Sequence, residues 1–169
     1  SHLGLITMLL GFGTEAAAVA AVFHIINHAT FKAALFMTAG IIDHEAGTRS
    51  IRGLGGLRRL MPITFVIGTV TALSMAGVAP LNGFLSKEMM LQESSQMVWA
   101  GHPALIVTMA AIGAVFSVCY SLRFIWQVFF GPERDDYPHH PHDPGFGMWG
   151  SPALLAVLVV LIGLFSNTM

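Results

Sequence analysis

Three ionisable side chains lie in the first long apolar stretch of the sequence, spaced four residues apart. They are His24, His28 and Lys32, and the apolar run around them extends from about residue 16 to residue 42. In an α-helix, residues four apart lie on one face, about 6 Å from each other. Histidine titrates near neutral pH, and a lysine kept away from water gives up its proton more readily. The spacing therefore predicts a line of exchangeable protons inside an apolar helix.

Three cations on one stripe repel one another, so a proton that enters at one end tends to expel one at the other. This coupling is the basis of a proton relay, which is the role we favour for His24, His28 and Lys32. The alternative is a set of static hydrogen-bond partners that hold helices together. A Zn²⁺ site at the two histidines would need a further ligand, and Lys32 one turn on would repel the metal. We expect neither a metal nor a cofactor.

A second candidate site follows the break Pro80-Leu81-Asn82-Gly83, where Lys87 is next to Glu88. If a helix starts near Asn82, the positive end of its dipole disfavours the charged form of Lys87 and favours ionised Glu88. Helices interrupted by Pro and Gly at membrane depth are typical of ion sites in transporters. We therefore predict a proton-release gate at Lys87 and Glu88, with a structural ion pair near a surface as the alternative.

The composition indicates a membrane protein. Of the 169 residues, 54% are hydrophobic and 10% are charged, and the mean hydropathy is +0.70. An average soluble domain carries about 25% charged residues. Several apolar runs of about 18 residues or more predict a polytopic, all-α bundle. A large soluble helical protein is the alternative, but the polar residues are too few to cover its surface. The absence of a basic face argues against nucleic acid as a partner.

The order of apolar segments predicts about five membrane segments after an initial partial helix, one of them discontinuous. The partial helix is expected at 1–12, spans at 16–42, 62–79, 104–130 and 151–165, a shorter and more polar segment at 84–99, and polar loops at 43–60 and 131–150. Thr14 is a candidate N-cap, with Glu15 near the positive helix end. Because the first apolar piece is too short to span a bilayer, we expect a fragment whose first helix is cut.

Two other polar features are interpreted as parts of the surface. Arg123, near Tyr120 and Trp126, is expected to anchor the end of its span at the membrane interface. The histidines of the second loop, with acidic neighbours, are expected to be a solvated loop rather than a metal site. These residues are His139, His140, His142, Asp135, Asp136 and Asp143.

Residues 24–36, HIINHATFKAALF, resemble the antiporter-like subunits that Mrp-type Na⁺/H⁺ antiporters share with respiratory complex I. Residues 1–4 look like the middle of the helix that precedes this stretch in the family. Residues 84–88, FLSKE, look like its second discontinuous helix. Within the family, residues 41–49 and 54–57, IIDHEAGTR and LGGL, look most like the large A-type subunit of the Mrp antiporter. The resemblance covers nearly the whole chain.

The resemblance implies roles for single residues. His24 and His28 would belong to the connecting part of a hydrophilic axis, and Lys32 would lie on the same axis. Lys87 would be the terminal proton-gating lysine of the second half-channel. The first half-channel, with its Glu–Lys pair, would lie upstream of this chain.

The resemblance also implies a domain organisation: a second half-channel repeat at 1–130, truncated at its start, a loop at 131–150 and an additional transmembrane helix at 151–169. The two loops can be oriented in two ways. Four arginines in the loop 43–60 favour a cytoplasmic position by the positive-inside rule. The family topology implies instead that this loop lies outside and the loop 131–150 in the cytoplasm. We follow the family here.

The implied function is proton translocation in a multisubunit monovalent cation (Na⁺)/proton antiporter of a bacterial plasma membrane. Protons would pass along His24, His28 and Lys32 to Lys87. The expected partners are other membrane subunits of the same complex, the lipid bilayer, and Na⁺ and H⁺ as transported ions. Such a chain is part of a transporter and is not an enzyme. The alternatives are a proton-pumping subunit of complex I, an NADH-quinone oxidoreductase, and a structural fragment with fixed polar contacts.

Overall fold

The computed structural model is an elongated bundle of helices, and it describes residues 2–134 and 136–165. In chain order the elements are α1 (His2–Gly11), α2 (Glu15–Ala46), α3 (Leu57–Leu60), α4 (Pro62–Ala76), α5 (Asn82–Gln96), α6 (Leu105–Ile125), the π-helical turn η1 (Trp126–Phe130) and α7 (Phe146–Phe165). The all-α class and the discontinuous helix are confirmed. The expectations for residues 1, 135 and 166–169 concern positions outside the described ranges.

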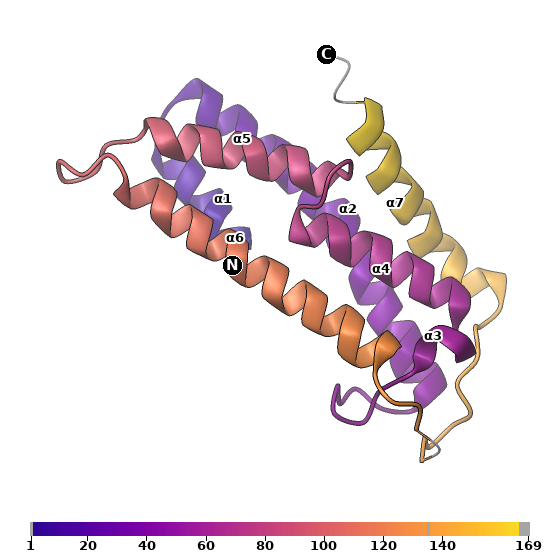
Figure 1. Cartoon of the computed structure of the whole chain (residues 1–169). Coiled ribbons are helices and arrows are strands. Elements are labelled where there is room, and N and C mark those ends of the chain that lie inside the picture. The colour runs from indigo at the N-terminus through magenta and orange to yellow at the C-terminus, as the bar shows by residue number, and fades with distance from the viewer. Residues whose placement is uncertain (1, 135, 166–169) are drawn as a thin grey trace.

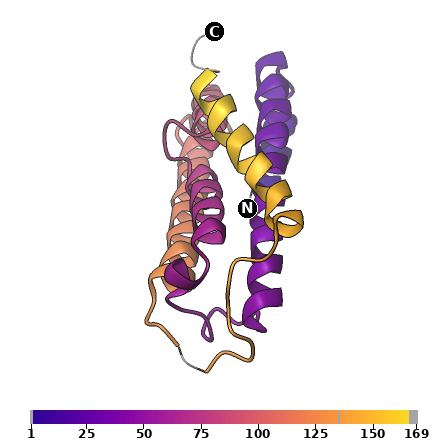
Figure 2. The ribbon, with the colours of Figure 1, turned by 90° about the vertical axis from the view of Figure 1, so that its right-hand side faces the viewer.

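Helix α2 runs the length of the molecule, and the other helices pack along it (Figure 1). Figure 2 shows two layers, with α1 and α2 in one and α4, α5 and α6 in the other. Helix α7 leans across both layers and contacts α2, α4 and α5. Helix α2 begins as expected, because the Thr14 hydroxyl accepts a hydrogen bond from the Ala17 N–H at 3.2 Å.

Helices α4 and α5 together make one crossing of the bundle. They follow each other end to end in both ribbon views, and each has 15 residues. A helix of that length measures about 22 Å, which is short of the roughly 30 Å of a bilayer core. The expected segments 62–79 and 84–99 are therefore two halves of one span. The number of crossings after α1 falls from five to four, formed by α2, α4 with α5, α6 with η1, and α7.

Two boundaries differ from the expectation. Helix α2 continues through Asp43 to Ala46, residues assigned to the first loop, because Gly47 at φ 70° closes it with an N–H bond to the Asp43 carbonyl. The loop also holds the short helix α3, which was not expected. Helix α7 starts at Phe146 instead of residue 151 and contains Pro152. Falling hydropathy marks where a helix leaves the membrane, not where its hydrogen bonds end.

The loops 47–61 and 131–145 lie at the same end of the bundle, which corrects the topology taken from the family resemblance. Tyr137 of the second loop bonds to Gly55 of the first, and Arg59 forms an ion pair with Glu133 at 2.7 Å. Because four crossings follow α1 instead of five, α2 and α6 end on the same side of the bundle, and so do the loops that follow them. The two loops cannot face opposite sides of a membrane.

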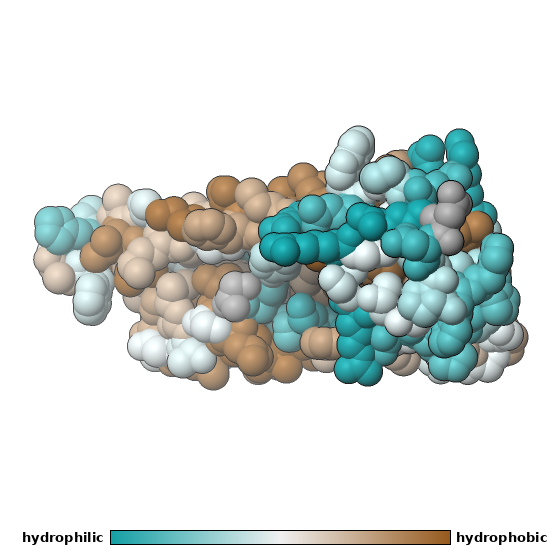
Figure 3. Space-filling view, turned by 90° about the horizontal axis from the view of Figure 1, so that it is seen from below, coloured by the Kyte–Doolittle hydropathy of each residue, from teal (hydrophilic) through white to brown (hydrophobic). Residues whose placement is uncertain are grey.

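The outer surface is apolar along most of its length. Figure 3 shows hydrophilic residues gathered over the end that holds the two loops, with mainly hydrophobic residues elsewhere on that face. In the part of the chain that the structure describes, three helical segments are long and apolar enough to cross a membrane: residues 15–46, 105–130 and 146–165. Large apolar side chains such as Phe36, Phe116 and Leu154 are more than 60% exposed in the isolated chain. A lipid bilayer or neighbouring subunits would cover such a surface.

Candidate functional site

The break between α4 and α5 is exposed at residues 78–80, and it is buried and closely packed from Leu81 to Gly83. Gly77, at φ 86°, ends α4, and α5 begins at Asn82 as the sequence predicted. A Cβ on Gly83 would overlap the carbonyl oxygen of Ser74, and a Cβ on Gly163 of α7 would overlap that of Pro80. Only glycine at these two positions lets the half-helices and α7 approach so closely.

Asn82 connects the break to α2 through buried hydrogen bonds. Its amide nitrogen donates to the Asn27 side-chain oxygen at 3.0 Å and to the Thr30 hydroxyl at 3.1 Å. Its amide oxygen accepts a bond from the Ser74 hydroxyl at 2.6 Å. Ser74, Asn27 and Asn82 are fully buried. These bonds satisfy polar groups that would otherwise be costly inside the bundle, and they fix α2 against both half-helices.

Lys87 places its ammonium group at the end of α4. Its Nζ donates to the Ala76 carbonyl at 3.0 Å and to the Ser117 hydroxyl of α6, and the residue is 7% exposed. The carbonyls of a last helical turn carry partial negative charge, so α4 supplies part of the stabilisation that an acidic partner would give. Glu88 is exposed and forms no ion pair in the described residues, which contradicts the alternative of a Lys87–Glu88 pair.

His24 is fully buried at the junction of three helices. One hydrogen bond joins its Nδ1 to the Ser86 hydroxyl of α5 at 3.0 Å, and another joins its Nε2 to Nδ1 of His2 in α1 at 3.2 Å. The His2 and His24 rings are stacked with centroids 5.3 Å apart. Ser86 directly precedes Lys87, so the residue of α5 that contacts His24 is adjacent in sequence to this lysine.

His28 and Lys32 lie on the same face of α2, yet their contacts differ. The His28 ring is half-buried, 6.1 Å from the His24 ring and 5.3 Å from the His2 ring between centroids. Lys32 lies 3.6 Å from the Met75 sulfur of α4 and 5.5 Å from the Phe36 ring. The structure therefore gathers the histidines into one cluster and directs the Lys32 ammonium toward α4.

Comparison with known proteins assigns the family. Residues 1–117 match the transmembrane family described as NADH:quinone oxidoreductase/Mrp antiporter. The chain belongs to this family. Among curated proteins it is 54% identical over 97% of its length to a probable A/B-type subunit of a K⁺/H⁺ antiporter from Rhizobium meliloti (strain 1021), and 44% identical over 98% to the A1 subunit of a Na⁺/H⁺ antiporter from Staphylococcus aureus (strain N315). It spans 16% and 23% of the lengths of these two proteins.

Solved structures of the family have the same fold. The Mrp complex from Dietzia sp. DQ12-45-1b matches 99% of this chain and 18% of its own chain, with a TM-score of 0.85 and 37% identity. An archaeal respiratory membrane complex, the membrane-bound sulfane sulfur reductase, matches 96% of this chain and 26% of its own, with a TM-score of 0.85 and 32% identity. The chain is thus a segment of an antiporter-like membrane subunit of the Mrp and complex I type.

Sequence reasoning missed several polar residues of the site in this antiporter-family chain. They are His2, Asn27, Asn82, Ser86 and Ser117. His2 and Asn27 carried a usable signal, because each is a polar residue within an apolar helical run. Ser117 carried none, since serines are common in membrane helices and only the fold brings it beside a lysine 30 residues away.

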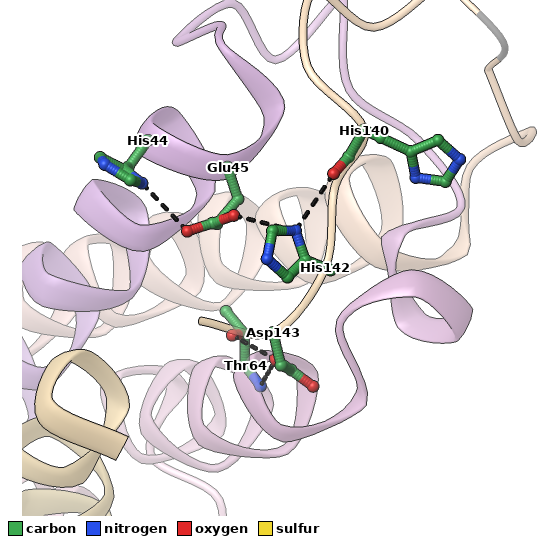
Figure 4. A network of polar contacts seen from close by, with 6 residues as sticks. All are labelled: His44, Glu45, Thr64, His140, His142 and Asp143. Atoms are coloured by element: carbon green, nitrogen blue, oxygen red, sulfur yellow. Dashed lines mark hydrogen bonds and ion pairs between the residues drawn. The ribbon is translucent and has the colours of Figure 1, made fainter. Parts of the chain in front are cut away.

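A second polar network lies at the end with the loops and joins the loop 131–145 to α2 and α4 (Figure 4). Glu45, 7% exposed, holds His44 at 3.0 Å and His142 at 3.2 Å. Asp143 accepts hydrogen bonds from the N–H groups of Ile63 and Thr64 at the start of α4. His139, His140 and His142 are exposed as expected, although His142 also contacts Glu45, and Asp143 is half-buried against the start of α4.

The same end contains other tethering contacts. The Tyr137 hydroxyl donates to the Gly55 carbonyl at 2.6 Å, and burial raises the pKa of this phenol, so it remains a donor at neutral pH. Arg123 is exposed and donates to Gln127 one turn along the helix at 3.0 Å, which leaves its anchoring role a prediction. Within residues 2–134 and 136–165, no group of three acidic, His or Cys side chains is arranged to hold a metal ion.

Proposed function

We propose that this chain is part of a proton-translocating membrane subunit of a multisubunit monovalent cation/proton antiporter. In this proposal the buried histidines relay protons toward Lys87, which gates their release. Related proteins are named as Na⁺/H⁺ and K⁺/H⁺ antiporter subunits, so Na⁺ is the cation proposed first and K⁺ is the competing candidate. The partners are other membrane subunits of the complex, in the plasma membrane of a bacterium.

The observation that carries the proposal is the environment of Lys87. Its ammonium group is buried with two neutral oxygen partners, Ala76 O and Ser117 Oγ. A charged group in a bilayer interior is expensive unless it serves a function or is paired. The partners of Lys87 stabilise the cation only in part, so the neutral amine remains accessible. A residue that can exist in both states is what a gate requires.

The histidine cluster supplies the route to this gate. His24 contacts Ser86, and Ser86 precedes Lys87 on the same half-helix. His28 adds a titratable ring beside His24, and Lys32 extends the set along α2 toward α4. We assign His24 the central position because it bonds to α1 and to α5. Glu88 is exposed next to the gate and is proposed to receive the released proton.

We use the distribution of arginines to orient the subunit in the membrane. Five arginines lie in the two loops that share one end: Arg49, Arg52, Arg58, Arg59 and Arg134. The connections at the opposite end, residues 12–14 and 97–104, contain no lysine or arginine. By the positive-inside rule we place the arginine end in the cytoplasm. The break in α4 and α5, with Lys87, then lies between this end and the outer surface.

The domain organisation is proposed on the same basis. Residues 1–130 form the second half-channel repeat, followed by a cytoplasmic loop at 131–145 and an additional transmembrane helix, α7, that starts at Phe146. Because the chain spans about a fifth of the relatives it matches, transport is a property proposed for the whole subunit in its complex.

The test uses the full subunit that contains this segment, assembled in its complex in inverted membrane vesicles. Lys87→Ala should abolish the pH change that Na⁺ or K⁺ induces, because the gating amine is gone. Arg123→Ala is the matched control, since it removes an exposed cation outside the buried network. Assembly of each complex is quantified so that transport is expressed per complex.

Each outcome decides between the candidates. Normal cation-dependent transport by Lys87→Ala would refute the gate. Proton pumping driven by NADH, without a response to Na⁺ or K⁺, would favour the complex I alternative that the family description includes. If the variants of His24 and His28 lower only assembly and leave transport per complex intact, the contacts are structural.

A further inference from the structure

His2 is a further buried histidine beside the proposed proton path, and the proposed function gives it no role. His2 of α1 is 4% exposed, and its Nδ1 forms the 3.2 Å hydrogen bond with Nε2 of His24. We propose that His2 is the residue that delivers protons to His24, so that the path enters the cluster from α1. This inference rests on the proposed function, because it needs His24 to carry protons.

The geometry of His2 suits a transfer in one direction. One ring nitrogen, Nδ1, contacts His24, while the other, Nε2, is buried and has no hydrogen-bond partner among the described residues. Buried polar atoms without a partner are uncommon and call for an explanation. Because Nδ1 is the nitrogen bonded to His24 and Nε2 is left over, a proton taken up at Nε2 can leave from Nδ1.

The ring contacts of His2 place it at the centre of the histidine cluster. It stacks on His24, lies at the same centroid distance of 5.3 Å from His28, and meets the edge of Phe31 at 5.7 Å. The hydrogen bond selects His24 as the acceptor over His28, whose ring is near but not bonded. Phe31 closes one side of the cluster with an apolar ring and so directs the exchange toward the other histidines.

The transfer conserves protons and charge. A proton binds Nε2 of neutral His2 and makes the ring a cation. The N–H bond at Nδ1 then breaks as a new N–H bond forms at Nε2 of neutral His24. His2 is left neutral with its proton on Nε2, and His24 carries the added charge. Repulsion between the two rings prevents both from holding an extra proton at once, which favours onward movement.

A purely structural role would require of residue 2 only one hydrogen bond to His24. Any side chain that donates or accepts one hydrogen bond would satisfy Nε2 of His24, and an amide would do so without an orphaned ring nitrogen. The decisive variant is therefore His2→Gln, which keeps a polar partner for His24 but cannot take up a proton on one atom and release it from another. His2→Asn is a second variant of the same kind with a shorter side chain.

The experiment measures cation/proton exchange by the full subunit in its assembled complex, with His24→Gln in parallel. His102→Gln, an exposed loop histidine, is the matched control. We expect His2→Gln to assemble, to keep the KM for Na⁺ or K⁺, and to lose about 100-fold in maximal rate, the usual size of a lost proton-transfer group. A structural role would leave the maximal rate unchanged while the hydrogen bond is preserved.

The outcomes separate this inference from the proposed function. If His24→Gln loses transport and His2→Gln retains it, the proposed function stands and the role of His2 is overturned. If both variants transport normally, the proposed function itself fails. If neither His2→Gln nor His2→Asn assembles, the side chain serves the packing of α1 on α2, and the inference is likewise overturned.

Discussion

The arginine end and the helix break differ in the partners that they give to basic side chains. At the arginine end, basic side chains face carboxylates: Arg49 with Asp43 at 2.8 Å, Arg59 with Glu133 at 2.7 Å, and His142 with Glu45 at 3.2 Å. Around the helix break, the basic side chains face uncharged groups: Lys87 a carbonyl and a hydroxyl, Lys32 a thioether, and the histidines each other and Ser86.

The choice of partner distinguishes a region that attaches loops to helices from a region that is proposed to exchange protons. A carboxylate partner stabilises the protonated cation and keeps it so, which suits the attachment of a loop to helix ends. A neutral partner stabilises both protonation states, which suits a group that takes up and releases protons. The arginine end is also exposed, where single ion pairs contribute only about 0–1 kcal/mol. Under the proposed function, the arginine end orders the loops and the helix break is the site of proton exchange.

The largest effect is expected where the interior region is packed most closely. Gly83→Ala places a methyl group on the Ser74 carbonyl, so α4 and α5 cannot keep their arrangement. We expect the subunit to be lost from the assembled complex. Gly40→Ala, in α2 with nothing within 4 Å of its added Cβ, is the control and should assemble normally. Normal assembly of Gly83→Ala would show that the break tolerates movement.

The next effect concerns the buried histidine at the junction. His24→Gln keeps a hydrogen-bonding side chain but removes a titratable ring, and we expect a loss of about 100-fold in transport per complex. Glu45→Gln at the arginine end should leave transport per complex near the wild-type level, because its contacts fasten a loop. Equal losses in the two variants would remove the distinction between the regions.

Asn82 tests how far the interior region also contributes to stability. Asn82→Ala removes its bonds to Asn27, Thr30 and Ser74, and it leaves the buried Asn27 side-chain oxygen without its donor and the Ser74 hydroxyl without its acceptor. Each unsatisfied group costs about 1–3 kcal/mol, so the thermal unfolding midpoint of the detergent-solubilised complex should fall clearly. An unchanged midpoint would indicate that water replaces these bonds.

A smaller effect is expected from the cap that the second loop gives to α4. Asp143→Ala removes the acceptor for the N–H groups of Ile63 and Thr64, and loss of such a cap costs about 1 kcal/mol. Limited proteolysis within residues 131–145 should become faster while transport per complex is retained. Asp143→Asn keeps an acceptor oxygen and should restore much of the protection. Reduced transport in Asp143→Ala would connect the loop to the proton path.

The sequence predicted the features that depend on neighbouring residues. The break at Pro80–Gly83, the start of a helix at Asn82 and the stripe of His24 and His28 all follow from local spacing. The sequence did not predict contacts between residues that lie far apart in the chain. The contacts of His24 with Ser86, 62 residues away, and of Lys87 with Ser117, 30 residues away, exist only in the fold.

The error in topology has a similar origin. An apolar segment at 62–79 and a more polar one at 84–99 were counted as two membrane segments, and only the end-to-end arrangement of α4 and α5 shows that they form one crossing. Once they are counted together, the arginine-rich loop 47–61 and the loop 131–145 share one side of the bundle, so the positive-inside rule assigns both loops the same orientation. The topology implied by the family resemblance, with the two loops on opposite sides, is the prediction that the contacts between the loops contradict.

The central claim is that Lys87 works because its partners are neutral, and Ser117 provides the most direct test. Ser117→Asp would place a carboxylate beside the Lys87 ammonium and hold it protonated, while Ser117→Asn offers a neutral partner of similar size. Cation-dependent proton transport per assembled complex is measured for both variants. The account predicts that Ser117→Asn retains transport and Ser117→Asp loses it. Equal transport by the two variants would contradict the account.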